Sequence, residues 1–126
     1  MSTAQKIVMI VEDEPDAAEL FAEMMRLDGF RVIKTYSSTP AIGLIMQEKP
    51  DLILLDIMMP EISGLDILRS MRSNPDLALI PVVVISARAT PTDIKNGLDA
   101  GASIYLTKPV SYMDLKNAVD GLLQGK

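Results

Sequence analysis

Along the chain, short runs of apolar residues alternate with longer stretches in which apolar and polar positions are mixed. Residues 7–11 (IVMIV), 52–55 (LILL) and 82–85 (VVVI) are apolar at every position, which is typical of strands buried on both faces. The longer stretches repeat apolar residues at spacings of three and four, which predicts helices with one buried stripe. The predicted strands are residues 7–11, 31–35, 52–55, 82–85 and 104–106, and the predicted helices are residues 15–28, 40–48, 64–72, 92–100 and 111–123.

Residues that favour helix ends stand at the ends of these stretches. Pro15 occupies the first helical position, where its missing N–H would be unpaired in any case. Gly29 and Gly101 follow the first and fourth predicted helices, as C-capping glycines commonly do. We expect Ser38 or Thr39 to cap the second helix with its side-chain oxygen.

Strict alternation of five strands with five helices predicts an α/β fold, in which a parallel sheet carries helices on both faces. Right-handed crossovers leave few topologies, and for five such units the flavodoxin-like strand order 2-1-3-4-5 is the leading one. A length of 126 residues suits one domain. We therefore expect a single domain over residues 1–126, with its core at about residues 6–123.

Composition narrows the chemistry that this fold can carry. The chain has no cysteine and no histidine, which excludes disulfides, thiol nucleophiles, imidazole bases and histidine phosphorylation. The net charge of −5 opposes direct nucleic-acid contact and binding to an anionic membrane surface. No apolar run approaches the roughly 20 residues that a membrane span needs. We expect a cytoplasmic protein that reacts through carboxylates, hydroxyls or amines.

Polar residues stand where the predicted strands end. Glu12 and Asp13 follow the first strand, and Asp56 follows the third. Ser86 follows the fourth strand, and Lys108 follows the fifth. In an open parallel sheet, ligands bind beyond the carboxyl ends of the strands, and the order 2-1-3-4-5 sets strands one, three and four side by side. We therefore expect these five side chains to share one pocket.

The residue types in this pocket favour phosphoryl chemistry with a divalent cation. Three crowded carboxylates repel one another, and oxygen ligands without histidine or cysteine fit Mg²⁺. Lys108 would pair with Asp56 or with a phosphoryl group on it, and Ser86 would donate a hydrogen bond. Each group alone also has a simpler explanation, as a solvated acidic helix start, a loop residue, a strand-end cap or a turn. Together they suit a carboxylate nucleophile that accepts a phosphoryl group.

The motifs resemble the receiver domain of response regulators in two-component signalling, over about residues 6–123. The resemblance is carried by the acidic pair in VEDEP (11–15), Asp56 in LLDIMMP (54–60), Gly64 eight residues beyond it, Ser86-Ala87 after VVVI, and Lys108-Pro109 in YLTKP (105–109). It implies that Asp56 is the phosphoacceptor, and that the donor is a sensor histidine kinase or a histidine phosphotransfer protein. It also implies a cis peptide bond between Lys108 and Pro109.

The resemblance implies a role for each further residue of the site. Asp13 would bind Mg²⁺ directly, Glu12 would act mainly through a water, and the backbone carbonyl of Met58 would be another ligand. Ser86 would be the switch hydroxyl that moves to the phosphoryl group. Tyr105 would be the switch aromatic, whose ring turns inward on activation.

A changed surface is the output that the resemblance implies. The fourth helix, fifth strand and fifth helix would bind an unidentified output partner or domain, or a second copy of the chain as a homodimer. Since the domain modifies itself, we expect no multiple-turnover enzyme.

Met58 and Arg88, two residues beyond Asp56 and Ser86, would flank the pocket. The Arg88 guanidinium would lie across the opening of the pocket and prolong the life of the acyl phosphate.

The chain departs from the family pattern at two positions, and three other functions are alternatives to the receiver. The acidic pair is Glu-Asp where Asp-Asp is commoner, and Ser86 replaces a more frequent threonine, but both keep the functional group. A haloacid-dehalogenase-like phosphohydrolase would need a second aspartate where Met58 stands. A degenerate receiver would lack the acidic pair, the acceptor or the lysine. A flavodoxin would need Ser, Thr and Gly in place of the acidic loop EDEPD (12–16).

Overall fold

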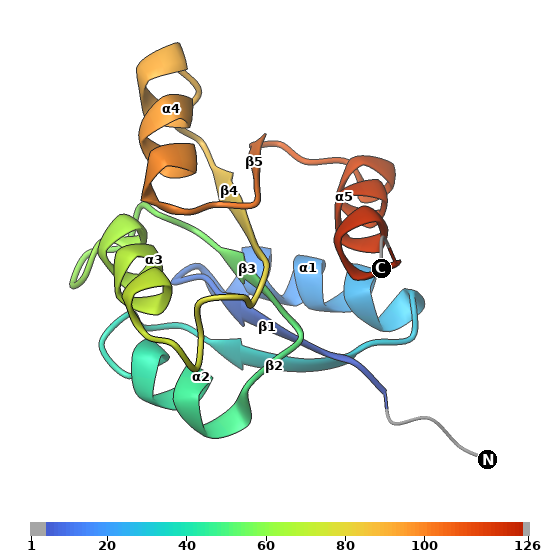
Figure 1. The fold of residues 1–126 in the computed structure, drawn as a ribbon. Coiled ribbons are helices and arrows are strands. Elements are labelled where there is room, and N and C mark those ends of the chain that lie inside the picture. Colours follow the sequence, from blue (N-terminus) through green and yellow to red (C-terminus); the bar gives the residue numbers. More distant parts are fainter. Residues whose placement is uncertain (1–4, 125–126) are drawn as a thin grey trace.

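The computed structural model describes residues 5–124 and contains all ten predicted elements (Figure 1). The strands are β1 (Ile7–Val11), β2 (Arg31–Thr35), β3 (Leu52–Leu55), β4 (Val82–Ser86) and β5 (Ile104–Thr107). The helices are α1 (Pro15–Leu27), α2 (Ala41–Glu48), α3 (Gly64–Ser73), α4 (Pro91–Ala100) and α5 (Tyr112–Gln124). Each end lies within one residue of the prediction. The outermost parts of the predicted domain, residues 1–4 and 125–126, lie outside the described residues.

The five strands form one parallel sheet in the order β2-β1-β3-β4-β5, which confirms the predicted topology. The register pairs Val11 of β1 with Leu55 of β3, and Leu55 with Val84 of β4. Because Val11 and Leu55 are the last residues of their strands, the residues that follow them begin side by side. The three central strands therefore deliver their next residues to the same edge of the sheet.

The sheet separates two hydrophobic clusters. Successive strand residues point to opposite faces, so Met9 and Val11 belong to one cluster, and Val8 and Ile10 belong to the other. Helices α2, α3 and α4 cover the first cluster, and α1 and α5 cover the second (Figure 1). This arrangement confirms the prediction of helices on both faces.

The helices end much as predicted. Gly29 and Gly101 adopt positive φ angles of 90° and 120° at the ends of α1 and α4.

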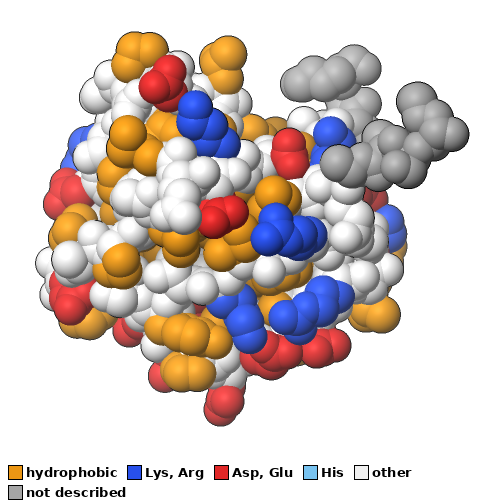
Figure 2. All heavy atoms as spheres, turned by 90° about the horizontal axis from the view of Figure 1, so that it is seen from below, with side chains coloured by type: hydrophobic (Ala, Val, Ile, Leu, Met, Phe, Trp, Pro, Cys, Tyr) orange, Lys and Arg blue, Asp and Glu red, His pale blue; other side chains and the backbone are white. Residues whose placement is uncertain are grey.

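Within residues 5–124, none of the helices is both long enough and apolar enough to cross a membrane. On the face seen in Figure 2, lysine and arginine side chains lie among aspartate, glutamate and hydrophobic ones, so positive charge there is bordered by negative charge.

The predicted cap of α2 is wrong. The residue that caps α2 is Pro40, and it makes no side-chain capping hydrogen bond. The Ser38 hydroxyl instead accepts a hydrogen bond from the N–H of Ile62 at 2.8 Å, and the Thr39 hydroxyl donates to Glu61 at 2.9 Å. Partners on the loop between β3 and α3 therefore take the groups that were expected to cap the helix.

Candidate functional site

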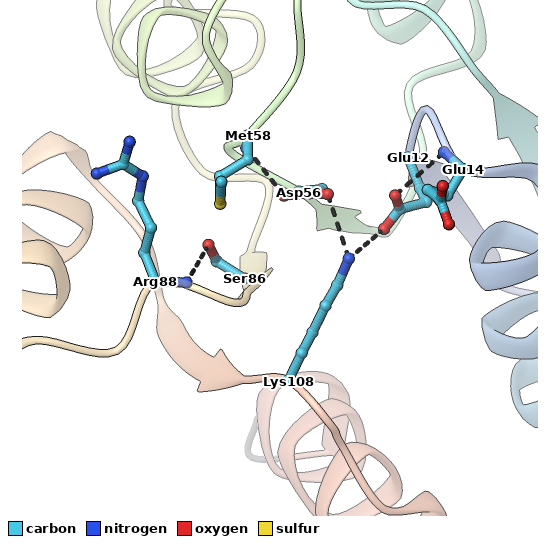
Figure 3. Close-up of polar contacts among 7 residues, drawn as sticks. All are labelled: Glu12, Glu14, Asp56, Met58, Ser86, Arg88 and Lys108. Atoms are coloured by element: carbon cyan, nitrogen blue, oxygen red, sulfur yellow. Dashed lines mark hydrogen bonds and ion pairs between the residues drawn. The ribbon is translucent and has the colours of Figure 1, made fainter.

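The predicted site residues gather at the C-terminal edge of the sheet (Figure 3). Glu12 and Asp13 follow β1, Asp56 follows β3 and Lys108 follows β5, as predicted. Ser86 differs slightly, because it is the last residue of β4 rather than the residue after it. Its backbone carbonyl accepts a hydrogen bond from the Lys108 N–H at 2.8 Å. The sheet ladder therefore links the last residue of β4 directly to the backbone of the lysine.

Three carboxylates form a compact acidic group. Glu12, Asp13 and Asp56 each place one oxygen within 4.8 Å of the others. Glu12 is 1% exposed and Asp56 is 6% exposed, so water does little to screen their mutual repulsion. Hard oxygen donors at this spacing fit Mg²⁺, which prefers carboxylates and retains several waters. The predicted convergence of the three carboxylates is confirmed.

Lys108 bridges two of these carboxylates. Its Nζ donates to Oε1 of Glu12 at 3.0 Å and to Oδ2 of Asp56 at 3.2 Å (Figure 3). Burial alone would lower the pKa of Lys108, but the hydrogen bond to Glu12 and the negative charges of Asp56 and Glu12 outweigh it and raise that pKa. The peptide bond between Lys108 and Pro109 is cis, as predicted.

The Glu12 carboxylate is held from two sides. Its other oxygen, Oε2, accepts a hydrogen bond from the N–H of Glu14 at 3.2 Å. Burial is the largest influence on this group and raises the pKa of Glu12; the hydrogen bond from Lys108 opposes that rise, and the negative charge of Asp56 adds to it. The Lys108 ammonium already offsets part of this electrostatic cost, and a divalent cation beside the carboxylates would offset more of it.

The loop after β3 fixes Asp56 by short-range contacts. Oδ1 of Asp56 accepts a hydrogen bond from the Met58 N–H at 2.9 Å, and the Asp56 N–H donates to the Val11 carbonyl at 3.0 Å. At Gly64, a Cβ atom would lie 2.5 Å from the Cα of Ile57 and 2.7 Å from the carbonyl oxygen of Asp56. The start of α3 therefore packs directly on the Asp56 backbone, which explains physically why glycine stands eight residues beyond it.

Ser86 and Tyr105 meet through the backbone of Arg88. The buried Ser86 hydroxyl accepts a hydrogen bond from the Arg88 N–H at 3.1 Å. The Tyr105 hydroxyl donates to the Arg88 carbonyl at 2.8 Å. Accepting the N–H leaves the proton of the Ser86 hydroxyl available for donation. Sequence reasoning missed this bridge, because every residue has a backbone N–H and carbonyl and no side-chain signal marks the ones that are used.

A groove of about 700 Å³ opens beside the acidic group. Its walls include Asp13, Met58 and Arg88, so the latter two residues do flank the site. The Arg88 guanidinium lies 3.7 Å from Oδ1 of Asp93, and its side chain is 58% exposed. Figure 3 shows it turned away from Asp56. The expectation that Arg88 lies across the opening is not met, because the carboxylate of Asp93 pairs with it instead.

Comparison of the sequence with known proteins finds a matching protein family and related proteins. The model of the response regulator receiver domain matches residues 8–120. A gliding motility regulatory protein of Myxococcus xanthus is 36% identical over 86 residues, which make up 68% of this chain and 7% of that protein. The chain thus spans a small part of this curated relative's length.

Solved structures agree in fold over nearly the whole chain. The signal receiver domain of a signal transduction histidine kinase from Syntrophus aciditrophicus has a TM-score of 0.88 at 32% identity, covering 95% of this chain and 91% of that one. The receiver domain of a sensor histidine kinase from Pseudomonas aeruginosa has a TM-score of 0.88 at 26% identity, covering 96% and 99%. That structure holds a magnesium ion in its active-site cleft.

Proposed function

Because the chain belongs to the response regulator receiver domain family of two-component signalling, we propose that Asp56 accepts a phosphoryl group from a phosphohistidine on a histidine kinase or histidine phosphotransfer protein. The observation that carries the proposal is the contact of Lys108 with both Asp56 and Glu12, inside a group of three carboxylates. A buried carboxylate is suited to accept a phosphoryl group, and the cation beside it is suited to neutralise the negative charge of that group.

In the proposed transfer, a carboxylate oxygen of Asp56 forms an O–P bond while the P–N bond to the donor imidazole breaks. The imidazole nitrogen keeps the electron pair of the broken bond. Lys108 can release Glu12 and follow the new negative charge, because its Nζ already lies 3.2 Å from Oδ2 of Asp56. The Ser86 hydroxyl donates a hydrogen bond to a phosphoryl oxygen, while the Arg88 N–H holds the hydroxyl oxygen in place.

The same residues suit a resident Mg²⁺. Asp13 and Asp56 would bind it directly, Glu12 would act through a water, and the Met58 carbonyl would supply another oxygen. When bound, Mg²⁺ supplies positive charge to the phosphoryl oxygens. The donor set of three carboxylate oxygens within 4.8 Å supports this assignment.

The proposed output is a change of surface rather than turnover. Asp56 keeps its phosphoryl group until water hydrolyses the acyl phosphate, so the domain modifies itself and is not a multiple-turnover enzyme. The change would spread through Ser86 and Tyr105 to α4. An output partner, or a second copy of the chain, would bind over α4, β5 and α5. We propose that this signalling takes place in the cytoplasm and without direct nucleic-acid contact, which the net charge of −5 opposes.

The test of the proposal is chemical modification followed by intact mass measurement. Acetyl phosphate with Mg²⁺ should add one phosphoryl group, and hydroxylamine should remove it, as it does from acyl phosphates. Asp56→Asn should abolish the adduct, whereas Asp76→Asn, at an exposed position, should leave it unchanged. An adduct of the same lability on the Asp56→Asn protein would overturn the assignment.

A further inference from the structure

Gly97 stands in the interior of α4, where glycine is unfavourable. A glycine inside a helix costs about 1 kcal/mol relative to alanine, because it gives up more backbone freedom. Gly97 is buried, and a Cβ atom there would lie 2.6 Å from Cδ2 and 2.7 Å from Cε2 of Tyr105. The edge of the Tyr105 ring therefore occupies the space that a side chain at residue 97 would fill.

The two other glycines in helix interiors are different from Gly97, whereas Gly64, the first residue of α3, packs on the Asp56 backbone. At Gly43 in α2 and Gly121 in α5, an added Cβ atom would meet no heavy atom within 4 Å. Both could become alanine without a steric conflict. The close approach of Tyr105 is therefore a property of position 97 and not of helical glycines in this chain.

We propose that Gly97 is a positioning residue for the Ser86 hydroxyl, acting through Tyr105 and the backbone of Arg88. With the ring seated against Gly97, the Tyr105 hydroxyl reaches the Arg88 carbonyl at 2.8 Å. The N–H of the same residue holds the Ser86 hydroxyl at 3.1 Å. The consequence for phosphoryl transfer rests on the proposed function, in which Ser86 contacts the phosphoryl group.

The seat at Gly97 matters because its surroundings are fixed. Gly97 lies in the last turn of α4, and its carbonyl accepts a hydrogen bond from the N–H of Ala102, just beyond the helix, at 3.1 Å. The Tyr105 ring is attached to β5, which pairs with β4 and packs near α4 (Figure 1). A methyl group at residue 97 would therefore drive the half-buried ring away from α4 and break its hydrogen bond to Arg88.

The loop between β4 and α4 would feel this change directly. The two hydrogen bonds of the Arg88 backbone tie the loop to Ser86 on one side and to Tyr105 on the other. The Arg88 side chain adds only a 3.7 Å contact with Asp93 on α4, and that contact does not reach the sheet. Among the hydrogen bonds within residues 5–124, losing the Tyr105 contact leaves the one to the Ser86 hydroxyl to hold Arg88 to the sheet.

The experiment compares Gly97→Ala with Gly43→Ala and Gly121→Ala in the unphosphorylated protein. NMR would measure the chemical shifts of the Tyr105 ring, together with hydrogen exchange of the Arg88 N–H. We expect Gly97→Ala to displace the ring, which would shift its signals, and to speed Arg88 exchange by about fivefold, as loss of one net hydrogen bond would. The control variants should match the parent, although all three substitutions favour helix formation.

Substitutions of Tyr105 keep the test decisive if Gly97→Ala folds poorly. Tyr105→Phe retains the ring and loses the hydroxyl, and it should speed Arg88 exchange without losing the contact with Gly97. Adding Gly97→Ala to Tyr105→Ala should change Arg88 exchange no further than Tyr105→Ala does alone. Unchanged Arg88 exchange in Gly97→Ala or in Tyr105→Phe would overturn the positioning role. An equal change of Arg88 exchange in the glycine controls would overturn it too.

Acetyl phosphate modification then separates this inference from the proposed function. If Gly97 positions Ser86, Gly97→Ala should slow modification of Asp56 several-fold relative to the two control variants. Equal rates would overturn the link to Ser86. A parent protein that is not modified at all would instead count against the proposed function, while the exchange measurements would still decide whether Gly97 positions the loop.

Discussion

Lys108 and Arg72 are both half-buried cations, but they lie at opposite edges of the sheet and have different partners. Lys108, where the strands end, donates to the carboxylates of Glu12 and Asp56. Arg72, before β4 and β5 begin, donates to three backbone carbonyls, those of Gly101, Ala78 and Ile80.

The pKa values of the two cations shift in opposite directions. Burial lowers the pKa of Arg72, whereas negative partners raise the pKa of Lys108. In the proposed function, Lys108 can exchange a carboxylate partner for a phosphoryl oxygen, whereas nothing replaces the carbonyls around Arg72. The fork of the guanidinium suits several fixed acceptors, and the compact ammonium suits a charge that moves. In the proposed function, the difference separates a cation that holds the fold from one that would assist phosphoryl transfer.

The largest expected effect that would test this comparison is on the rate of modification. Lys108→Met, with Mg²⁺ present, should slow modification by acetyl phosphate about 100-fold, because it removes a charged donor aimed at the reacting oxygens. Lys116→Met is the control, since Lys116 pairs with Asp120 on α5 at 2.7 Å. Intact mass against time gives both rates. A Lys108→Met protein modified as fast as the control would break the comparison.

Arg72 should give the converse result. Arg72→Met leaves three backbone carbonyls without their donor, so the free energy of unfolding in urea should fall by about 2–4 kcal/mol. Arg69→Met, on the same helix, removes only an exposed ion pair to Asp66 and should cost much less. Folded Arg72→Met should still be modified at the parent rate. A slowed rate with unchanged stability would contradict the division of roles.

Part of this comparison was visible in the sequence and part was not. Lys108 could be found because it follows a predicted strand and precedes a proline, and the central apolar runs made the topology predictable. Arg72 could not, because its acceptors are backbone carbonyls, which every residue has. The bridge through Arg88 was missed for the same reason. The expected cap by Ser38 failed because Ile62, distant in sequence, is the donor that its hydroxyl meets in the fold.

A smaller effect is expected on the affinity for Mg²⁺. If the partners of Lys108 are exchangeable, Mg²⁺ should bind among them without any phosphodonor present. Asp13→Asn should weaken this binding at least about tenfold, because a direct ligand loses its charge. Asp16→Asn, in the first turn of α1, is the control. Calorimetric titration measures both, and equal affinities would remove Asp13 from the ligand set.

Alkaline pH gives the smallest expected effect. The pKa of Lys108 is raised above its ordinary value of 10.5, so its charge stabilises the folded state. This contribution is complete below pH 10.5 and is lost as the pH rises through the folded-state pKa. In urea unfolding from about pH 9 to about pH 12, the parent should therefore lose more stability than Lys108→Met. Other lysines titrate in both proteins and cancel in this difference. Equal losses would show that the pairing adds no net stability.

The separation of the core into two clusters has an evolutionary consequence. Residues on one face of the sheet, such as Met9, share no cluster with those on the other, such as Val8. Substitutions beneath α1 and α5 can therefore accumulate without repacking the layer beneath α2, α3 and α4, because the backbone of the sheet lies between them. Descendants of such a chain can therefore change the helices on one face of the sheet while the packing on the other face stays the same. The site residues at the C-terminal edge of the sheet can be kept in all of these descendants.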